Sequence, residues 1–198
     1  MTSETTTNAP AQNVSNIDCD VVDTDNQLPP LPNPLPKEHP QFLHCMPPNE
    51  PTYRDFSLFL AGSIEMGNAI RWQQHMANIL RDLPITITNP RRGHWDKNAR
   101  PLPTDKTFRA QVEWELNAMT KATVICFFFD KNTKSPVTLL ELGLWASSGK
   151  IVVCCPDGFW KGGNVDIVCE RYKVPCVKTF EALVPEVKKM LKVKGMDI

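Results

Sequence analysis

Short apolar runs alternate with amphipathic segments along most of the chain, beginning at Phe56. Uninterrupted apolar or β-branched runs predict strands, and fully apolar runs predict strands buried on both faces. Apolar residues that recur at helical spacing predict helices. The predicted strands are 56–61, 85–88, 122–129, 151–155 and 173–177, and the predicted helices are 64–83, 108–119, 136–148 and 180–193. The alternation predicts an α/β fold whose parallel sheet of five strands is covered by helices on both faces.

The first 50 residues follow no such period. They hold nine of the 18 prolines, and six of these lie in the stretch 29–40. Such a segment buries too little apolar surface to offset its ordering entropy. We therefore predict a disordered Pro-rich tail over 1–50, followed by one domain over 51–198. The tail is either a plain extension or a polyproline ligand for a proline-binding module.

Charge and composition narrow the class of protein. The 22 basic and 22 acidic residues give a formal net charge of zero, which argues against binding to nucleic acid or to an anionic membrane. The first residues lack a basic and apolar leader, and no apolar stretch approaches the roughly 20 residues that span a bilayer. Seven cysteines without metal-ligand spacing favour a reduced, cytoplasmic protein with buried thiols and no metal.

The carboxyl ends of parallel strands are where such sheets bind ligands. Four stretches with unusual residues follow predicted strands, and these are Gly62-Ser63, 89–96, 135–141 and 158–164. A Gly-Ser turn offers backbone N–H groups and a hydroxyl for a phosphate or a sugar, although it also suits a plain turn. The last stretch, with three glycines and two aromatic residues, is predicted to be mobile and could cover a pocket.

The helix at 136–148 carries the most unusual residue, Glu141. Ser135 suits its N-cap, Pro136 its first position, and Gly149 the residue after its end. Because the helix is very apolar, Glu141 must be paired or face a polar cleft. The positive end of the helix favours the ionised carboxylate, a nucleophile toward an electron-poor sugar carbon. The pattern alone leaves a buried structural ion pair equally open.

The polar loop 89–96 and the helix before the third strand add further candidates. Trp95 could stack on a base, and Asp96 or Asn89 could hydrogen-bond to its edge. Arg91 or its neighbour could meet a phosphate. Glu115 is a candidate second carboxylate, and the alternative is a solvated surface residue. The alternative for the loop is that it is solvated and that its tryptophan packs against a helix.

Together these features resemble the nucleoside 2-deoxyribosyltransferase-like superfamily over about 56–170. The resemblance is carried by Phe59-Leu60-Ala61-Gly62-Ser63-Ile64, by Asn89-Pro90-Arg91-Arg92 with Trp95-Asp96, and by Ser135-Pro136 through Glu141-Leu142-Gly143 with Gly149-Lys150. It implies a flavodoxin-like three-layer sandwich and no cofactor. It also implies that Glu141 attacks C1′ of a nucleoside and forms a glycosyl-enzyme ester, which water or a second base resolves. Members are dimers or larger, and Asn164 is a candidate for completing a neighbour's site.

One departure from the family pattern bears on the reaction. Deoxyribosyltransferases that resemble this chain carry an aspartate about six residues before the glutamate, where this chain has Ser135. The Ser-Pro start and the Gly62-Ser63 turn look more like nucleoside-monophosphate N-hydrolases, which favours hydrolysis over transfer. In this hypothesis Asp96 or Glu115 helps to protonate the leaving base. The alternatives are a nucleotide sensor without turnover and, less favoured, a flavin-binding flavodoxin-like protein.

Overall fold

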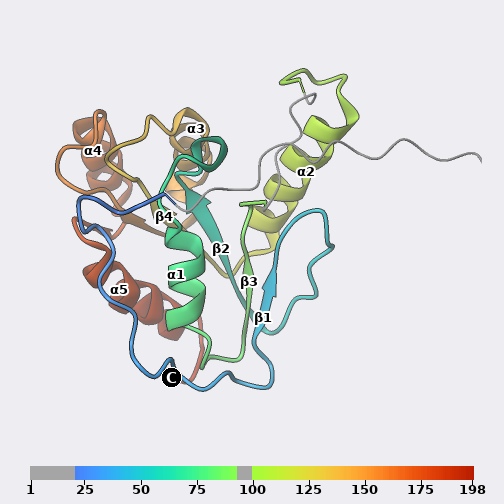
Figure 1. Cartoon of the computed structure of the whole chain (residues 1–198), viewed down its shortest axis with the longest axis vertical. Coiled ribbons are helices and arrows are strands. Elements are labelled where there is room, and N and C mark those ends of the chain that lie inside the picture. Colours follow the sequence, from blue (N-terminus) through green and yellow to red (C-terminus); the bar gives the residue numbers. More distant parts are fainter. Residues whose placement is uncertain (1–20, 93–99) are drawn as a thin grey trace, which may run out of the picture.

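The computed structural model describes residues 21–92 and 100–198 of the chain. Its centre is a parallel sheet with the strand order β1-β3-β2-β4-β5-β6 (Figure 1). The strands are β1 Leu43–Cys45, β2 Phe56–Gly62, β3 Ile85–Thr88, β4 Val124–Phe128, β5 Ile151–Cys154 and β6 Cys176–Val177. The α/β class and the parallel sheet are thus confirmed, and the arrangement is consistent with a flavodoxin-like fold.

Helices cover both faces of the sheet, and each face has its own apolar core. One core joins the sheet to α1 (Trp72–Ile79) and α5 (Phe180–Val193), which lie in front of the strands in Figure 1. The other joins it to α2 (Lys106–Lys121), α3 (Pro136–Trp145) and α4 (Gly162–Tyr172). Successive residues of a strand point to opposite faces, so a strand between two cores is apolar throughout. This explains the uninterrupted apolar runs.

The prediction of five strands is wrong, because β1 adds a sixth at the edge of the sheet. Leu43 pairs with Thr86 and Cys45 with Thr88 of β3. Three half-buried residues beside a Pro-rich stretch carry too little pattern to predict a strand. Their pairing depends on β3, which lies about 40 residues later in the sequence.

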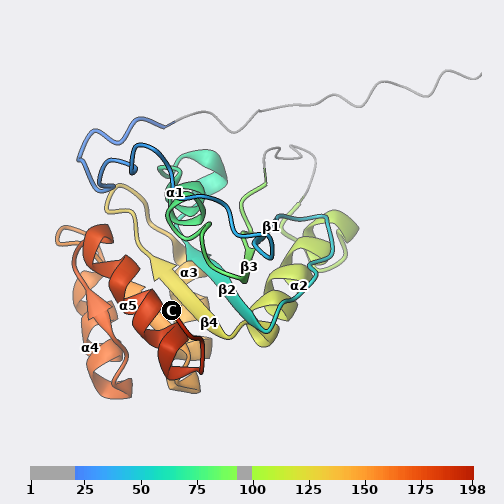
Figure 2. The same cartoon turned by 90° about the horizontal axis from the view of Figure 1, so that it is seen from below.

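The prediction of disorder is also wrong for residues 21–50, which wrap around the domain (Figure 2). Val21, Leu28 and Phe42 pack against the core beneath α1 and α5. The backbone N–H of His39 donates to the carbonyl of Arg81 at 2.8 Å. Prolines restrict the unfolded chain, so fixing this extended segment costs less entropy than the composition suggested. Residues 1–20 lie outside the described part of the chain.

Two further predictions need correction, one of a helix and one of a loop. The helix predicted over 64–83 is interrupted, because Glu65, Met66 and Gly67 all have positive φ, and α1 begins only at Trp72. Left-handed residues cannot continue a right-handed helix. The predicted mobile loop 158–164 runs instead into α4, which begins at Gly162 and buries Val165 and Cys169.

Other elements match their predictions closely. Helix α5 spans Phe180–Val193, and Thr179 caps it by accepting from the N–H of Ala182. Helix α3 ends at Trp145 and continues as a short 3-10 turn, Ala146–Ser148, with Gly149 left-handed behind it. The buried cysteines of the strands are free thiols. Among the helices of the described residues, none has the length and apolarity needed to cross a membrane.

Gly62 marks a close approach between β2, β4 and α1, which leads to a prediction about stability. A Cβ at this position would come within 2.4 Å of the Phe128 carbonyl oxygen and 2.5 Å of the Trp72 ring. Gly62→Ala is therefore expected to lower the free energy of unfolding by about 1–3 kcal/mol, measured by urea denaturation. Gly143→Ala is the control, because a Cβ there meets nothing within 4 Å inside α3. It should be neutral or stabilising by up to about 1 kcal/mol. Equal losses in both variants would contradict this packing.

Candidate functional site

The carboxyl ends of β2 and β4 meet where the strand order reverses. Strands β3 and β4 follow β2 in the sequence, but they lie on opposite sides of β2 in the sheet. Ligands of open α/β sheets bind in the crevice beyond such a point. Gly62 is paired with Phe128 at the ends of the two strands. The segments that follow, 63–71 and 129–135, therefore meet at the predicted ligand edge.

Three buried hydroxyl groups join these segments. Ser63 Oγ lies 2.6 Å from Ser135 Oγ, and Thr133 Oγ1 lies 2.8 Å from each of them. Ser63 Oγ also accepts a hydrogen bond from the backbone N–H of Asp130 at 2.8 Å. The cluster thus binds the end of β2 to the loop that leads into α3. Thr133 was not among the predicted site residues, although it lies two residues before Ser135.

The prediction that the Gly62-Ser63 turn offers free donors is wrong for Ser63. Its N–H donates to the Phe128 carbonyl at 3.0 Å, and its carbonyl accepts from the side chains of Trp72 and Gln73. Ser135 also differs from its prediction as a side-chain cap of α3. It is left-handed, with φ 47°, and its hydroxyl makes no capping hydrogen bond. Both serines hold the turn together instead.

Glu65 supplies the anion at the start of α3. Its Oε1 accepts from the backbone N–H of Lys134 at 2.7 Å and from that of Ser135 at 3.3 Å. A negative group at a helix N-terminus is favourable, because the N–H groups there have no partner within the helix. Sequence reasoning missed Glu65, since its residue type and position are also typical of a solvated turn.

Arg91 was predicted as a phosphate ligand, and the structure shows its guanidinium bound to backbone. It is buried, and it donates to the carbonyl of Ile70 at 2.9 Å and to that of Gly67 at 3.1 Å. It therefore holds the left-handed turn that carries Glu65. Asn89, predicted to contact the base, is also buried and accepts from the Arg91 N–H at 2.9 Å. Its amide nitrogen lies 3.2 Å from a ring nitrogen of His44 in β1.

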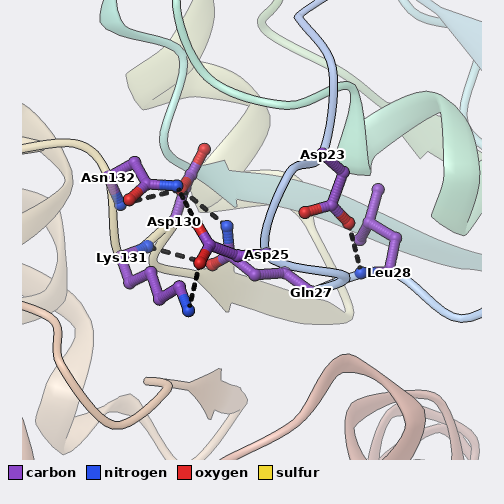
Figure 3. Close-up of polar contacts among 7 residues, drawn as sticks. All are labelled: Asp23, Asp25, Gln27, Leu28, Asp130, Lys131 and Asn132. Carbon is purple, nitrogen blue, oxygen red and sulfur yellow. Dashed lines mark hydrogen bonds and ion pairs between the residues drawn. The ribbon is translucent and has the colours of Figure 1, made fainter.

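The N-terminal segment reaches this edge through Asp130, which follows β4. Gln27 donates to Asp130 Oδ1 at 2.9 Å and accepts from the Lys131 N–H at 3.0 Å. Asp25 binds Lys131 Nζ at 2.8 Å and Asn132 Nδ2 at 2.7 Å (Figure 3). The second oxygen of Asp130 accepts from the Ile70 N–H at 3.0 Å. Asp130 thus connects three segments that are far apart in the sequence.

Glu141 lies in the second turn of α3 and is 92% buried. Burial, reinforced by the negative charge of Glu115, raises its pKa to about 8. Among the described residues, none forms a hydrogen bond or ion pair with its carboxyl group. The sequence predicted that the helix end would favour the ionised form, and this prediction is wrong. Loss of hydration dominates, so Glu141 holds its proton at neutral pH.

Glu115 lies on α2 and forms the second carboxyl group of this region. Burial raises its pKa, while a hydrogen bond from Gln111 Nε2 at 2.5 Å and the charge of Arg92 lower it. Gln111 accepts in turn from Arg92 Nε. Two carboxyl groups with different surroundings can divide acid and base roles.

Two of the remaining predicted site residues, Trp95 and Asp96, lie outside the described residues. Asn164 is exposed at the start of α4 and lines a mostly apolar groove between α3 and α4, together with Leu142 and Trp160. Glu141 does not line this groove. Within residues 21–92 and 100–198, no cluster of three or more acidic, histidine or cysteine side chains suits a metal ion.

The fold is that of a doubly wound α/β protein. Its switch point carries a turn rich in hydroxyl groups, and the helix that follows carries a buried carboxyl group. These features are typical of α/β proteins that bind a small ligand. The model of the family Nucleoside 2-deoxyribosyltransferase like matches residues 55–159, more than half of the chain. The chain belongs to this family, which indicates a nucleoside deoxyribosyltransferase-like activity. No curated protein sequence matches it. The family match leaves out the N-terminal segment with β1.

The raised pKa of Glu141 makes stability depend on pH. The folded protein holds this proton between pH 4.5 and about 8, whereas the unfolded chain has released it, so stability falls as the pH rises through this window. Glu141→Gln removes the effect. The free energy of unfolding of the variant, relative to that of the wild type, should be higher at pH 8.5 than at pH 5 by about 2–5 kcal/mol. Urea denaturation at both pH values measures this gain.

The matched control for this prediction is Glu113→Gln, at an exposed position of α2. It should follow the wild type at both pH values. A constant difference between Glu141→Gln and the wild type would show that Glu141 ionises normally.

Proposed function

We propose that the protein cleaves the N-glycosidic bond of a nucleoside or nucleoside monophosphate, with Glu141 as the nucleophile. The family match supports the substrate class, and the observation that carries the assignment of Glu141 is its burial without a hydrogen-bond partner among the described residues. A desolvated carboxylate is more reactive toward a sugar carbon than a hydrated one. The burial of Glu141 thus has a chemical use that a structural ion pair would lack.

The reaction proceeds in two steps. The ionised Glu141 attacks C1′ and the C1′–N bond breaks, with its electron pair going to the base. Asp96, from the loop outside the described residues, helps to deliver a proton to that base, and Glu115 helps to orient it. Water then displaces the carboxylate from the glycosyl ester and releases the free sugar, as in retaining glycosidases. Ser135, in place of the aspartate of the transferases, supports water rather than a second base as the acceptor.

Removing the carboxylate tests this proposal. Glu141→Gln should lower base release by about 10³-fold or more, because the covalent path is lost. Chromatographic detection of free base from a panel of nucleosides and monophosphates measures it. Glu113→Gln is the matched control and should retain wild-type turnover. Unchanged base release in Glu141→Gln would eliminate Glu141 as the nucleophile.

The pH dependence separates two roles for Glu141. A nucleophile must be ionised, so kcat/KM should rise with pH and level off above an apparent pKa near 8. An acid that protonates the leaving base would give the opposite profile, with activity falling above that pKa. The profile of the wild type therefore tests the assignment without a mutation.

The raised pKa of Glu141 also favours one alternative function, a nucleotide sensor that binds without turnover. A protonated carboxyl group is a poor nucleophile but a good hydrogen-bond donor to a ligand. In this case, ligands from the same panel would bind, as measured by calorimetry, and no base would be released at any pH between 6 and 9.

The protein is further proposed to act as a cytoplasmic homodimer or larger assembly. The exposed side of α3 carries Val137, Leu140 and Leu144, which are 58–65% exposed and follow one stripe of the helix. An apolar stripe next to the candidate nucleophile supports a partner subunit at this face. Asn164 is the candidate for completing a neighbour's site.

A charge on this stripe tests the assembly. Leu140→Lys should convert a dimer into a monomer, measured by light scattering after gel filtration, because burying an unpaired charge is costly. Val193→Lys, at an exposed position on α5, is the control and should leave the dimer intact. A monomeric wild type, or a dimer that survives Leu140→Lys, would contradict the use of this face.

A further inference from the structure

The carboxylate of Glu65 lies at the N-terminal end of α3, beyond the switch point of the sheet. It accepts from two successive backbone N–H groups, those of Lys134 and Ser135, at the start of α3. Such N–H groups at the switch point of a doubly wound sheet are the usual donors to a phosphate. In this protein the chain supplies its own anion to them.

A second feature marks this part of α3 as a ligand site. Glu141 is more than nine-tenths buried, and none of the described residues forms a hydrogen bond with its carboxyl group. It lies six residues after Ser135, which corresponds to about 9 Å along a helix. Side chains tilt toward the N-terminus of their helix, which shortens this separation. A sugar with C1′ at Glu141 can therefore place its 5′ end near Glu65.

The backbone turn that carries Glu65 is held in place by the fold. Its turn is left-handed at three successive residues, with φ of 48°, 54° and 97° at Glu65, Met66 and Gly67. Arg91 holds this turn by donating to the carbonyls of Gly67 and Ile70. The cation that could have met a phosphate is thus bound to the turn that presents a carboxylate.

We propose that Glu65 is a specificity-determining residue that excludes a 5′-phosphate, so that the substrate is an unphosphorylated nucleoside. A phosphate would compete with the carboxylate for the same N–H groups and would be repelled by its charge. A 5′-hydroxyl is neutral and can donate a hydrogen bond to Glu65. This inference rests on the proposed cleavage of an N-glycosidic bond, and it resolves the choice between nucleoside and monophosphate left open there.

The first experiment compares kcat/KM for one 2′-deoxynucleoside and for its 5′-monophosphate. The wild type should prefer the nucleoside by at least tenfold. Glu65→Gln should reduce this preference at least tenfold, chiefly by lowering KM for the monophosphate, because the repulsion is gone. Glu113→Gln is the control and should keep the wild-type preference. A wild type that prefers the monophosphate, or a preference unchanged in Glu65→Gln, would overturn the proposal.

The second experiment does not depend on turnover. Inorganic phosphate is titrated into the wild type and into Glu65→Ala while the amide signals of Lys134 and Ser135 are followed by NMR. Phosphate should shift these signals only in the variant. Shifts in the wild type, or none in the folded variant, would overturn the role of Glu65. If no substrate loses its base in the first experiment, the proposed function fails, and this titration still decides whether Glu65 excludes phosphate.

Discussion

The meeting of β2 and β4 at Gly62 and Ser63 is the constraint on which the rest of the structure depends. The absence of a side chain at Gly62 lets the Phe128 carbonyl and the Trp72 ring approach the backbone of β2. The next residue, Ser63, is then completely buried and bonded on every polar group. This junction fixes where the loop after β4 runs and where α3 begins. The position of Glu141 follows from the start of α3.

Electrostatics at the site follow from the same geometry. The N-terminal end of α3 receives one carboxylate, Glu65, which is stabilised by backbone N–H groups. Glu141, farther along the helix, has no such donors among the described residues. Burial raises the pKa of its carboxyl group. Two glutamates on or beside one helix thus have opposite surroundings. These surroundings agree with the roles proposed for them, recognition of the substrate for Glu65 and chemistry for Glu141.

The sequence predicted the central strands and the long helices, because their patterns are local and repeat over many residues. The strand at 85–88 and the helix at 180–193 have the predicted bounds. It missed β1 and the ordered N-terminal segment, whose contacts with Arg81 and Asp130 join residues far apart in the sequence. It missed α4, since two glycines at the helix start resemble a loop.

The candidate site was predicted only in part, because some of its residues stand out in the local sequence and others do not. Glu141 stands out because a charged residue in an apolar helix is conspicuous in any sequence. Glu65 and Thr133 do not stand out, since their roles arise only when the turn after β2 meets the loop after β4. Arg91 is the converse case, because its residue type suggested a phosphate ligand and the fold uses it to hold a turn.

The most direct test of the central claim is to trap the glycosyl-enzyme. A nucleoside with fluorine at C2′ forms the ester with Glu141 but releases it slowly, since the electron-poor sugar resists the second step. Mass spectrometry of the intact protein should show the added mass of one fluorinated sugar, and peptide mapping should place it on Glu141. A label on Glu115, or turnover of natural substrate without any trapped sugar, would contradict the account.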